Sequence, residues 1–213
     1  MKLDCFIFDF DGTLAYSEPA YREAFSHSIR LHTGLEVTEL DFRDYWNTTP
    51  QEVLRRYSDE LLEEMLVSFE EHYYANHHHY LTPYEGIFET LDRLQAQGAR
   101  TAIVSLKPRR AGERELDITG LRSLIGSRVW GDDVRRPKPE PDGVLRALSE
   151  MEADPHRTLV IGDSPADIIM GRSAGTLTAA ALWGGSSRDR LLAEAPDFAL
   201  DAPTDLIRVM SDE

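Results

Sequence analysis

Residues 6–14 read Phe-Ile-Phe-Asp-Phe-Asp-Gly-Thr-Leu, an apolar run that ends in two carboxylates, Asp9 and Asp11, followed at once by Gly12. A buried strand is a costly place for a charged group unless a partner compensates it. In open α/β sheets, ligands bind where the chain leaves the carboxyl ends of the strands. The stretch therefore predicts a strand that ends in a reactive site holding a cation, where an aspartate can attack phosphorus.

The composition indicates a chain able to bury a core. It has 213 residues, 41% of them hydrophobic, which suits one domain or one domain with an insertion. No apolar run is long enough for a membrane span, and no signal-peptide pattern precedes the first expected strand. Cys5 is the only cysteine, so an intrachain disulfide is excluded and the thiol is expected in the core. These features favour a cytoplasmic protein.

The charge balance limits the partners. The formal net charge is −15, and an acidic protein repels a polyanion, so we expect no nucleic-acid partner and no membrane partner. A local group of cations can still bind a small phosphate ester. Besides Lys2, the only lysines are Lys107 and Lys138, and both fall in segments where a phosphate site needs cations. The sequence indicates no oligomeric state.

Residues 15–81 follow a helical pattern. Apolar residues recur at helical spacing over residues 18–30 and 58–69. Thr49-Pro50 reads as an N-cap followed by proline at the first helical position. The apolar faces of such helices need partners, so the segment is expected to pack as a small all-helical insert.

The rest of the chain alternates between strand and helix patterns. After the first strand, strands are expected at 100–104, 128–130, 158–161 and 176–181, and helices at 86–97, 109–117 and 142–149. Short strands alternating with helices form a parallel sheet with crossover helices. The expected fold is α/β, a Rossmann-like doubly wound parallel sheet. Its core covers residues 1–14 and 82–213, and the helical domain at 15–81 is inserted into it.

Polar residues stand at the ends of these strands. Ser105 ends the second expected strand, and Asp163 follows the buried strand at 158–161. Because the carboxyl ends of parallel strands share one edge, Asp9, Asp11 and Asp163 are expected to meet there. Their mutual repulsion would be relieved by a divalent cation, and oxygen ligands without His or Cys favour Mg²⁺ over Zn²⁺.

Four stretches in this order resemble the motifs of the haloacid dehalogenase-like (HAD) hydrolase superfamily. They are DxDGTL at 9–14, Ser105, Lys138 within Arg-Pro-Lys-Pro-Glu-Pro at 136–141, and GDSxxD at 162–167. The insert has the position and length of the helical cap of this superfamily, and the core resembles phosphoglycolate phosphatase-like enzymes over most of its length. Prolines on both sides of Lys138 limit the backbone freedom of its loop.

The resemblance implies magnesium-dependent hydrolysis of a small-molecule phosphate monoester through an aspartyl phosphate. Asp9 would be the nucleophile, and Asp11 the general acid and then the general base. Mg²⁺ would bind the Asp9 carboxylate, the Asp11 backbone carbonyl and Asp163. The phosphoryl oxygens would be held by Lys138, by Ser105 and by the backbone N–H groups around Gly12 and Leu106.

Three further residues, Thr13, Ser164 and Asp167, are expected to support these groups or to cap the following helix. Ser164 and Asp167 have the spacing of a capping box. Two interpretations of Asp167 stay open, a capping or supporting residue and a direct metal ligand, and the first is favoured. Leu106 stands where the superfamily often has asparagine, so a backbone donor remains but a side-chain contact to the substrate is lost.

Other functions compete with hydrolysis. A sugar-phosphate mutase of the beta-phosphoglucomutase type shares the fold, cap and motifs, and passes the phosphoryl group to a second sugar phosphate; Thr13 favours a hydrolase. A non-catalytic phosphate-binding module is the alternative of another class, although the chain has every catalytic group. A dehalogenase would leave Asp11 and Asp163 unexplained, and a phosphonatase needs a cap lysine that residues 15–81 lack.

The motifs predict chemistry but not the substrate. Tyr16 replaces an aspartate common after the first motif. Arg43, Trp46 and Asn47 lie between expected helices of the insert, where specificity is expected to arise. An arginine there suits a carboxylated substrate such as phosphoglycolate.

Overall fold

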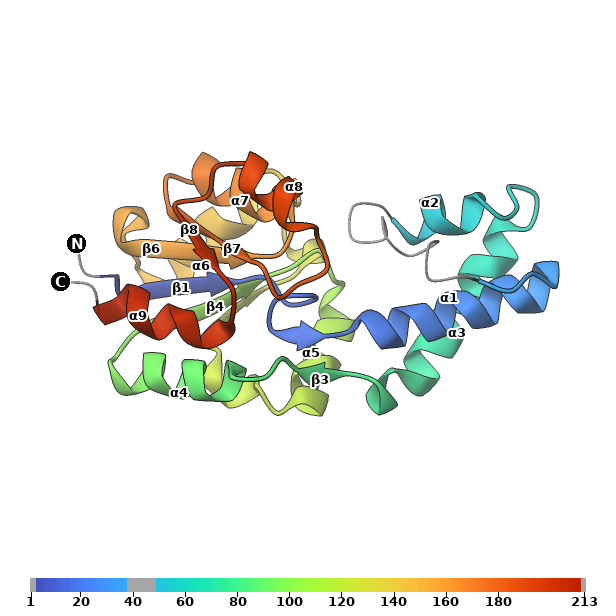
Figure 1. Ribbon diagram of the computed structural model, residues 1–213, viewed down its shortest axis with the longest axis horizontal. Coiled ribbons are helices and arrows are strands. Elements are labelled where there is room, and N and C mark those ends of the chain that lie inside the picture. Colours follow the sequence, from blue (N-terminus) through green and yellow to red (C-terminus); the bar gives the residue numbers. More distant parts are fainter. Residues whose placement is uncertain (1–2, 38–48, 212–213) are drawn as a thin grey trace. The chain divides into compact units, whose positions relative to one another are not determined.

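The computed structural model describes residues 3–37 and 49–211 (Figure 1). The chain divides into one unit made of Met1–Tyr16 and Thr82–Glu213 and a second unit, Ser17–Leu81. This division differs from the expected insert at 15–81 only at its start. Ala15 and Tyr16 form a short strand, β2 (Ala15–Tyr16), that pairs antiparallel with β3 (Thr82–Pro83), and this pairing keeps them in the first unit.

The first unit is built on a parallel sheet, as the sequence predicts. Within the described residues its strand order is β5-β4-β1-β6-β7-β8, formed by β1 (Cys5–Phe8), β4 (Arg100–Val104), β5 (Ser127–Val129), β6 (Thr158–Gly162), β7 (Leu177–Ala181) and β8 (Phe198–Leu200). The central strand β1 pairs in parallel with β4 on one side and β6 on the other. The chain thus winds outward in both directions from β1, and the α/β doubly wound fold is confirmed. The switch point lies at the carboxyl ends of β1 and β6.

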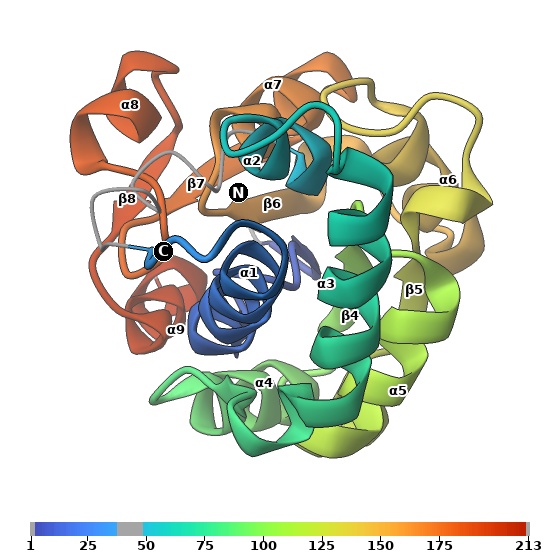
Figure 2. The same ribbon diagram turned by 90° about the vertical axis from the view of Figure 1, so that its right-hand side faces the viewer.

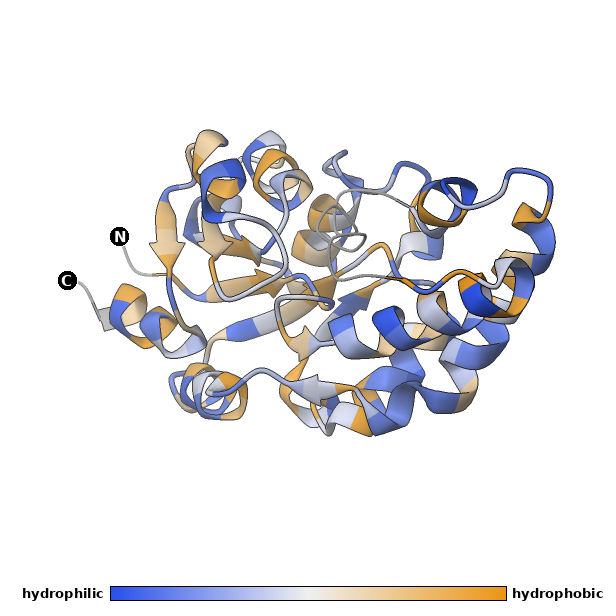
Figure 3. Cartoon of the chain, turned by 45° about the vertical axis from the view of Figure 1, so that its right-hand side comes forward, coloured by the Kyte–Doolittle hydropathy of each residue, from blue (hydrophilic) through white to orange (hydrophobic). Residues whose placement is uncertain are grey.

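Helices cover both faces of this sheet. They are α4 (Ile87–Ala96), α5 (Arg109–Thr119), α6 (Asp142–Met151), α7 (Pro165–Ser173), α8 (Arg188–Ala193) and α9 (Leu206–Ser211). Helices α6 and α7 pack on one face, and α4 and α9 lie together on the other (Figures 1 and 2). The strands are therefore buried on both sides, which explains their nearly continuous apolar sequences. Figure 3 shows the strands mostly in hydrophobic colours and the helices in mixed ones.

Short elements make up most of what the sequence pattern did not predict. They include β2, β3, β8 and the 3₁₀ turns η4 (Arg122–Leu124), η5 (Gly131–Asp133), η6 (Pro155–Arg157) and η7 (Pro203–Asp205). A strand of two or three residues carries no readable period, and it forms because a neighbouring strand offers hydrogen-bonding groups.

The second unit is helical in the part of it that the structure describes. It contains α1 (Glu18–Thr33), α2 (Pro50–Arg55), α3 (Leu62–Asn76) and the 3₁₀ turn η3 (His77–His79). Its buried core includes Phe25, Leu54 and Met65. Helix α2 begins as predicted at Thr49, whose side chain accepts from the Glu52 N–H while the Glu52 carboxylate accepts from the Thr49 N–H. No described helix combines the length and the hydropathy that a membrane crossing demands.

Gly112 of α5 provides a test of the packing that supports the site. A Cβ at this position would lie 2.3 Å from Cζ3 of the fully buried Trp130. We expect Gly112→Ala to lower the free energy of unfolding by roughly 2 kcal/mol, because overpacking outweighs a gain in helix propensity of up to about 1 kcal/mol. Chemical denaturation measures this change. Arg114→Ala, at an exposed position of the same helix, is the control and should be nearly neutral; equal stability of both variants would contradict the prediction.

Candidate active site

Three carboxylates meet at the carboxyl edge of the central strands. Asp9 follows β1, and its N–H donates to the carbonyl of Ile161 in β6, 2.9 Å away. Asp163 follows β6 directly. Asp9, Asp163 and Asp167 each offer a carboxylate oxygen, and these oxygens lie within 4.8 Å of one another. The sequence-predicted meeting of Asp9 and Asp163 at this edge is thus present in the structure.

Lys138 supplies the positive charge at this cluster. Its Nζ lies 2.8 Å from Oδ1 of Asp9 and 2.5 Å from Oδ1 of Asp167, and its side chain is 3% exposed. Burial by itself would lower the pKa of Lys138, but the carboxylates of Asp167 and Asp9 raise it above its ordinary value. The lysine therefore stays charged beside Asp9.

Asp9 sits in a balance of opposing effects. Burial raises the pKa of Asp9, the ammonium of Lys138 lowers it, and the carboxylate of Asp167 raises it. The net result is a pKa raised from 3.8 to about 7. Its Oδ1 also accepts from the N–H of Phe10 at 2.6 Å. The carboxylate is thereby fixed in orientation next to a lysine, which is the arrangement that a carboxylate nucleophile requires.

Asp163 is buried and is held by two neutral donors. The Thr13 hydroxyl donates to its Oδ1 at 3.1 Å, and the Gly185 N–H donates to its Oδ2 at 2.9 Å. Burial raises the pKa of Asp163 well above its ordinary value, and the nearby carboxylates of Asp9 and Asp167 raise it further. A carboxylate in these surroundings is stabilised in its charged form by a cation.

Gly12 has to be a glycine for two reasons. Its φ is +77°, and a Cβ there would lie 2.3 Å from Oδ2 of Asp163. Its N–H donates to the carbonyl of Ala15 at 2.9 Å. Because this N–H is already engaged, the structure does not support the prediction that it donates a hydrogen bond to a phosphoryl oxygen. Gly12 instead forms a tight turn that leaves room for Asp163.

A segment after β7 completes the surroundings of Asp163, and sequence reasoning missed it. The Trp183 Nε1–H donates to the carbonyl of Thr13 at 2.9 Å, so this segment is tied to the loop that follows Asp11. A Cβ on Gly184 would lie 2.2 Å from Cβ of Asp163. The available signal was Trp-Gly-Gly at 183–185, one residue after the strand expected at 176–181, because glycines near a strand end often mark a close approach of the backbone to another group.

Asp167 has both carboxylate oxygens engaged. Oδ2 accepts from the N–H of Ser164 at 3.1 Å and from its hydroxyl at 2.6 Å, while Oδ1 faces Lys138. Asp167 therefore caps the start of α7 and also holds the ammonium of Lys138. These contacts favour a capping and supporting role for Asp167, although one of its oxygens lies in the three-carboxylate cluster.

The Asp11 carboxylate is directed to a different lysine. Its Oδ1 lies 3.0 Å from Nζ of Lys107, which also pairs with Glu115 of α5. Lys107 thus contacts two carboxylates, whereas the sequence pattern predicted it as a cation for phosphate. Of the residues predicted from the second motif, Ser105 is buried and its Oγ accepts from the Lys107 N–H at 3.3 Å, and Leu106 is 55% exposed.

The predicted specificity residues fall in two places. Tyr16 is in β2, is 39% exposed and packs against Tyr84 with ring centroids 5.5 Å apart. Arg43, Trp46 and Asn47 lie outside the described residues.

The donor set at the cluster fits a hard metal cation. Three carboxylates face one ammonium group, so the cluster has an excess of negative charge. Its donors are all oxygens, which hard divalent cations prefer. Ser164 and Lys138 engage both oxygens of Asp167. Lys138 contacts Asp9 at Oδ1, and Asp163 is held by neutral donors.

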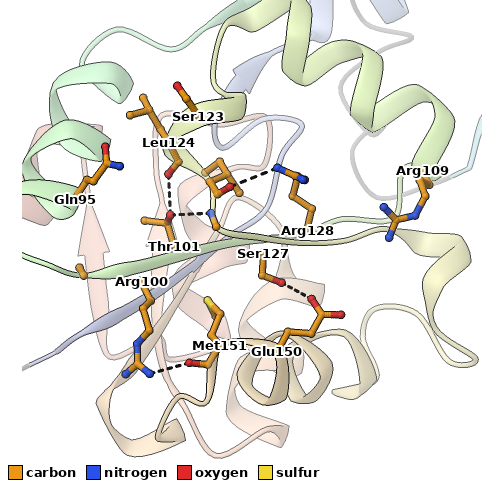
Figure 4. A pocket seen from close by; sticks show the side chains of 13 residues that line it. Gln95, Arg100, Thr101, Arg109, Ser123, Leu124, Ser127, Arg128, Glu150 and Met151 are labelled. Carbon is orange, nitrogen blue, oxygen red and sulfur yellow. Dashed lines mark hydrogen bonds between the residues drawn. The ribbon is translucent and has the colours of Figure 1, made fainter.

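A hollow of about 700 Å³ lies elsewhere in the first unit, at the amino-terminal ends of β4 and β5 (Figure 4). Two of its polar side chains have partners within the lining, since Thr101 donates to the Leu124 backbone carbonyl and Ser127 donates to the Glu150 carboxylate. It lies at the opposite strand ends from the carboxylate cluster. The site is therefore assigned from the cluster and its charges.

Comparison with known proteins agrees with this geometry. The family model described as haloacid dehalogenase-like hydrolase matches residues 6–181. Pyrophosphatase PpaX of Bacillus thuringiensis (strain Al Hakam) is 31% identical over 212 residues, covering 100% of this chain and 98% of that protein.

Solved structures share the fold. A predicted phosphoglycolate phosphatase from Haemophilus somnus 129pt has a TM-score of 0.87 at 22% identity, covering 98% of each chain. A beta-phosphoglucomutase candidate from Thermotoga maritima has a TM-score of 0.85 at 23% identity, covering 98% of this chain and 99% of that one. With the family model matching most of the chain and a relative matching all of it, this protein belongs to the haloacid dehalogenase-like hydrolase family.

Proposed function

We propose that the protein is a magnesium-dependent phosphatase that hydrolyses a small-molecule phosphate monoester through an aspartyl phosphate on Asp9. One observation carries the proposal. The Asp9 carboxylate contacts the ammonium of Lys138 and has an oxygen within 4.8 Å of an oxygen of Asp163. A nucleophile placed between a fixed cation and a candidate metal ligand matches the charge requirements of phosphoryl transfer.

In the first step, an oxygen of Asp9 attacks phosphorus. A bond forms between that oxygen and phosphorus, the bond from phosphorus to the ester oxygen breaks, and the carboxyl proton of Asp11 passes to the leaving oxygen. Lys138 stabilises the negative charge on the phosphoryl oxygens, and the loop of Ser105 and Leu106 orients them.

In the second step, water attacks the phosphorus of the aspartyl phosphate. The water gives a proton to Asp11, the bond from phosphorus to Asp9 breaks, and inorganic phosphate leaves. Asp9 and Asp11 then return to their starting protonation states.

The Mg²⁺ ligands would be the carboxylates of Asp9 and Asp163 and the backbone carbonyl of Asp11. When bound, the ion neutralises charge on the phosphoryl group and orients it for in-line attack. Thr13 and Gly185 keep Asp163 oriented through their hydrogen bonds, which is how outer ligands tune a metal site.

Phosphoglycolate and pyrophosphate are the first substrates to compare. The resemblance of the core to phosphoglycolate phosphatases supports the first, and 31% identity to a pyrophosphatase over the whole chain supports the second. We assign the helical unit, residues 17–81, to substrate selection as a cap. A cytoplasmic location and the absence of a nucleic-acid partner stay predictions.

The direct test measures phosphate release from a panel of these two compounds and several sugar phosphates, with Mg²⁺ and with EDTA. Magnesium-dependent release from at least one compound is expected, and the ranking of kcat/KM then identifies the substrate class. Release that is equally fast in EDTA would overturn the metal assignment. No release from any compound would overturn the phosphatase, and conversion of one sugar phosphate into its isomer would then identify a mutase.

The pH dependence of stability tests the carboxylate cluster without any assay of activity. The pKa of Asp9 is raised from 3.8 to about 7 and that of Asp163 is also raised. Between the unfolded and folded pKa values, the native state keeps a proton that the unfolded chain has lost. The free energy of unfolding in EDTA should therefore fall as pH rises from about 4 to about 7. Because Mg²⁺ binds ionised carboxylates, it should raise the melting temperature more near pH ~8 than near pH ~6. A larger shift at the lower pH would contradict the assignment of these ligands.

A further inference from the structure

Glu115, Lys107 and Asp11 form a chain of charges beneath the active-site edge. The Lys107 Nζ lies 3.0 Å from Oδ1 of Asp11 and also pairs with Oε2 of Glu115. The side chain of Lys107 is 2% exposed and that of Glu115 is 0% exposed, whereas that of Asp11 is 16% exposed. The row of charged groups thus runs from Glu115, in the interior at α5, outward to Asp11.

These charges are costly to bury, so their presence needs an explanation beyond the fold. The desolvation of two buried charges often exceeds their mutual attraction, and apolar residues of similar volume can replace such a pair without loss of stability. Lys107 also lies 5.5 Å from the centre of the Phe10 ring, a position that suits an apolar side chain as well as a lysine. Of the three groups, Asp11 is the one whose side chain is partly exposed, at 16%.

The surroundings of Lys107 argue against direct phosphate binding. Its ammonium is buried between two carboxylates, and Lys138 already supplies a cation beside the nucleophile. A phosphoryl oxygen would have to reach an ammonium whose side chain is 2% exposed and which already pairs with two carboxylates. The geometry instead places the ammonium 3.0 Å from Oδ1 of Asp11 as an ion pair, and Glu115 pairs with the same ammonium from the interior.

We propose that Lys107, anchored by Glu115, is a positioning residue that orients the Asp11 carboxyl group for proton transfer. This proposal rests on the proposed phosphatase function. With one oxygen held by Lys107, the other carries the proton that passes to the leaving ester oxygen as its bond to phosphorus breaks. The same oxygen then takes the proton of the attacking water as the bond from phosphorus to Asp9 breaks. Orientation of this kind strengthens general acid–base catalysis, which contributes about 10²–10⁴-fold to a rate.

The leaving group distinguishes this role from phosphate binding. The alkoxide leaving group of phosphoglycolate needs a proton from Asp11, whereas p-nitrophenolate leaves p-nitrophenyl phosphate without one. Both compounds form the same aspartyl phosphate, and its hydrolysis needs Asp11 as a base in both cases. Without the positioning lysine, the first step with p-nitrophenyl phosphate should therefore keep its rate. The first step with phosphoglycolate, and the second step with both compounds, should slow.

The experiment compares the wild-type enzyme with the double variant Lys107→Met/Glu115→Gln, which removes the two fully buried charges together. Glu115→Gln alone is the second variant, because it keeps the contact between Lys107 and Asp11 and removes only the anchor. Glu113→Gln, on the same helix, is the control, since its carboxylate pairs with Arg122 and Arg128. Rapid-mixing measurements with Mg²⁺ follow nitrophenolate release, and steady-state assays follow phosphate release from phosphoglycolate. Thermal melts report folding.

For the double variant we expect kcat on phosphoglycolate to fall by about 10²-fold with KM nearly unchanged. With p-nitrophenyl phosphate, a fast burst of about one nitrophenolate per enzyme should be followed by slow turnover. Glu115→Gln should show the same pattern with a smaller loss, and the control should match the wild type.

Two other outcomes would overturn the positioning role alone. One is a slowing of the nitrophenolate burst as large as the loss of kcat on phosphoglycolate. The other is a rise in KM for both esters at unchanged kcat, which would assign Lys107 to phosphate binding. A wild-type enzyme that releases neither phosphate nor nitrophenolate would overturn the proposed function and this proposal with it.

Discussion

Asp9→Asn is expected to reduce phosphate release from every ester by roughly 10⁴-fold or more, because an amide oxygen cannot form the acyl phosphate that the reaction requires. The structure allows this change with little disturbance. Asparagine has nearly the same shape, and it removes one carboxylate from a cluster in which Asp167 and Asp11 raise the pKa of Asp9. The melting temperature in EDTA should therefore be equal or higher, so that loss of activity cannot be attributed to unfolding.

Asp4→Asn is the matched control for this variant. Asp4 precedes the opposite end of the same strand and pairs with Arg100 and Arg157, away from the cluster. It should keep wild-type kcat/KM. Mass spectrometry of wild-type enzyme quenched during turnover should find phosphate on the peptide that contains Asp9. Substantial activity of Asp9→Asn would reject Asp9 as the nucleophile.

Lys138→Met is expected to have the second largest effect, a loss of roughly 10³-fold in kcat/KM. The ammonium is the cation beside the Asp9 nucleophile, at 2.8 Å, and it also lies 2.5 Å from Asp167. Its removal takes away charge stabilisation from the transferring phosphoryl group and leaves two carboxylates without their counter-ion. Because phosphoryl transfer depends on charge stabilisation and positioning, both losses lower the rate.

The same variant should also be less stable, by about 3 kcal/mol at neutral pH and above, since a buried ion pair that loses one partner leaves an uncompensated charge. Protonation of the carboxylates relieves that charge, so the loss should shrink as pH falls. Arg136→Met is the control. It lies in the same loop, is 62% exposed and pairs with Asp142, and it should change neither property. Equal activity of the two variants would remove Lys138 from the proposed mechanism.

Much of the fold was predictable because its strands are buried on both faces. In Thr158–Gly162 the interior residues Leu-Val-Ile are apolar and Asp163 follows the strand directly, and alternation with amphipathic helices then indicates a parallel sheet. The short strand Phe198–Leu200 was missed, because three residues carry only a weak pattern. The pairing of β2 with β3 was also missed, and it moved the boundary between the units from residue 15 to residue 17.

The sequence by itself determined which residues reach the edge of the sheet. Asp9 and Asp163 each follow a recognisable strand, and parallel strands bring their carboxyl ends together whatever the details of packing. Asp167 was identified as a capping residue from its spacing to Ser164, because a capping box is a contact within one turn.

Only the tertiary structure decided how these groups pair. Thr13 and Asp163 are separated by 150 residues, and Trp183 and Thr13 by 170. The motif around Lys138 placed that lysine at the site, but nothing in the sequence indicated that Lys107 pairs with Asp11 and Glu115. The physical reason is that local patterns fix the direction and burial of an element, whereas the partner of a charged side chain is chosen by the packing of segments far apart in the chain.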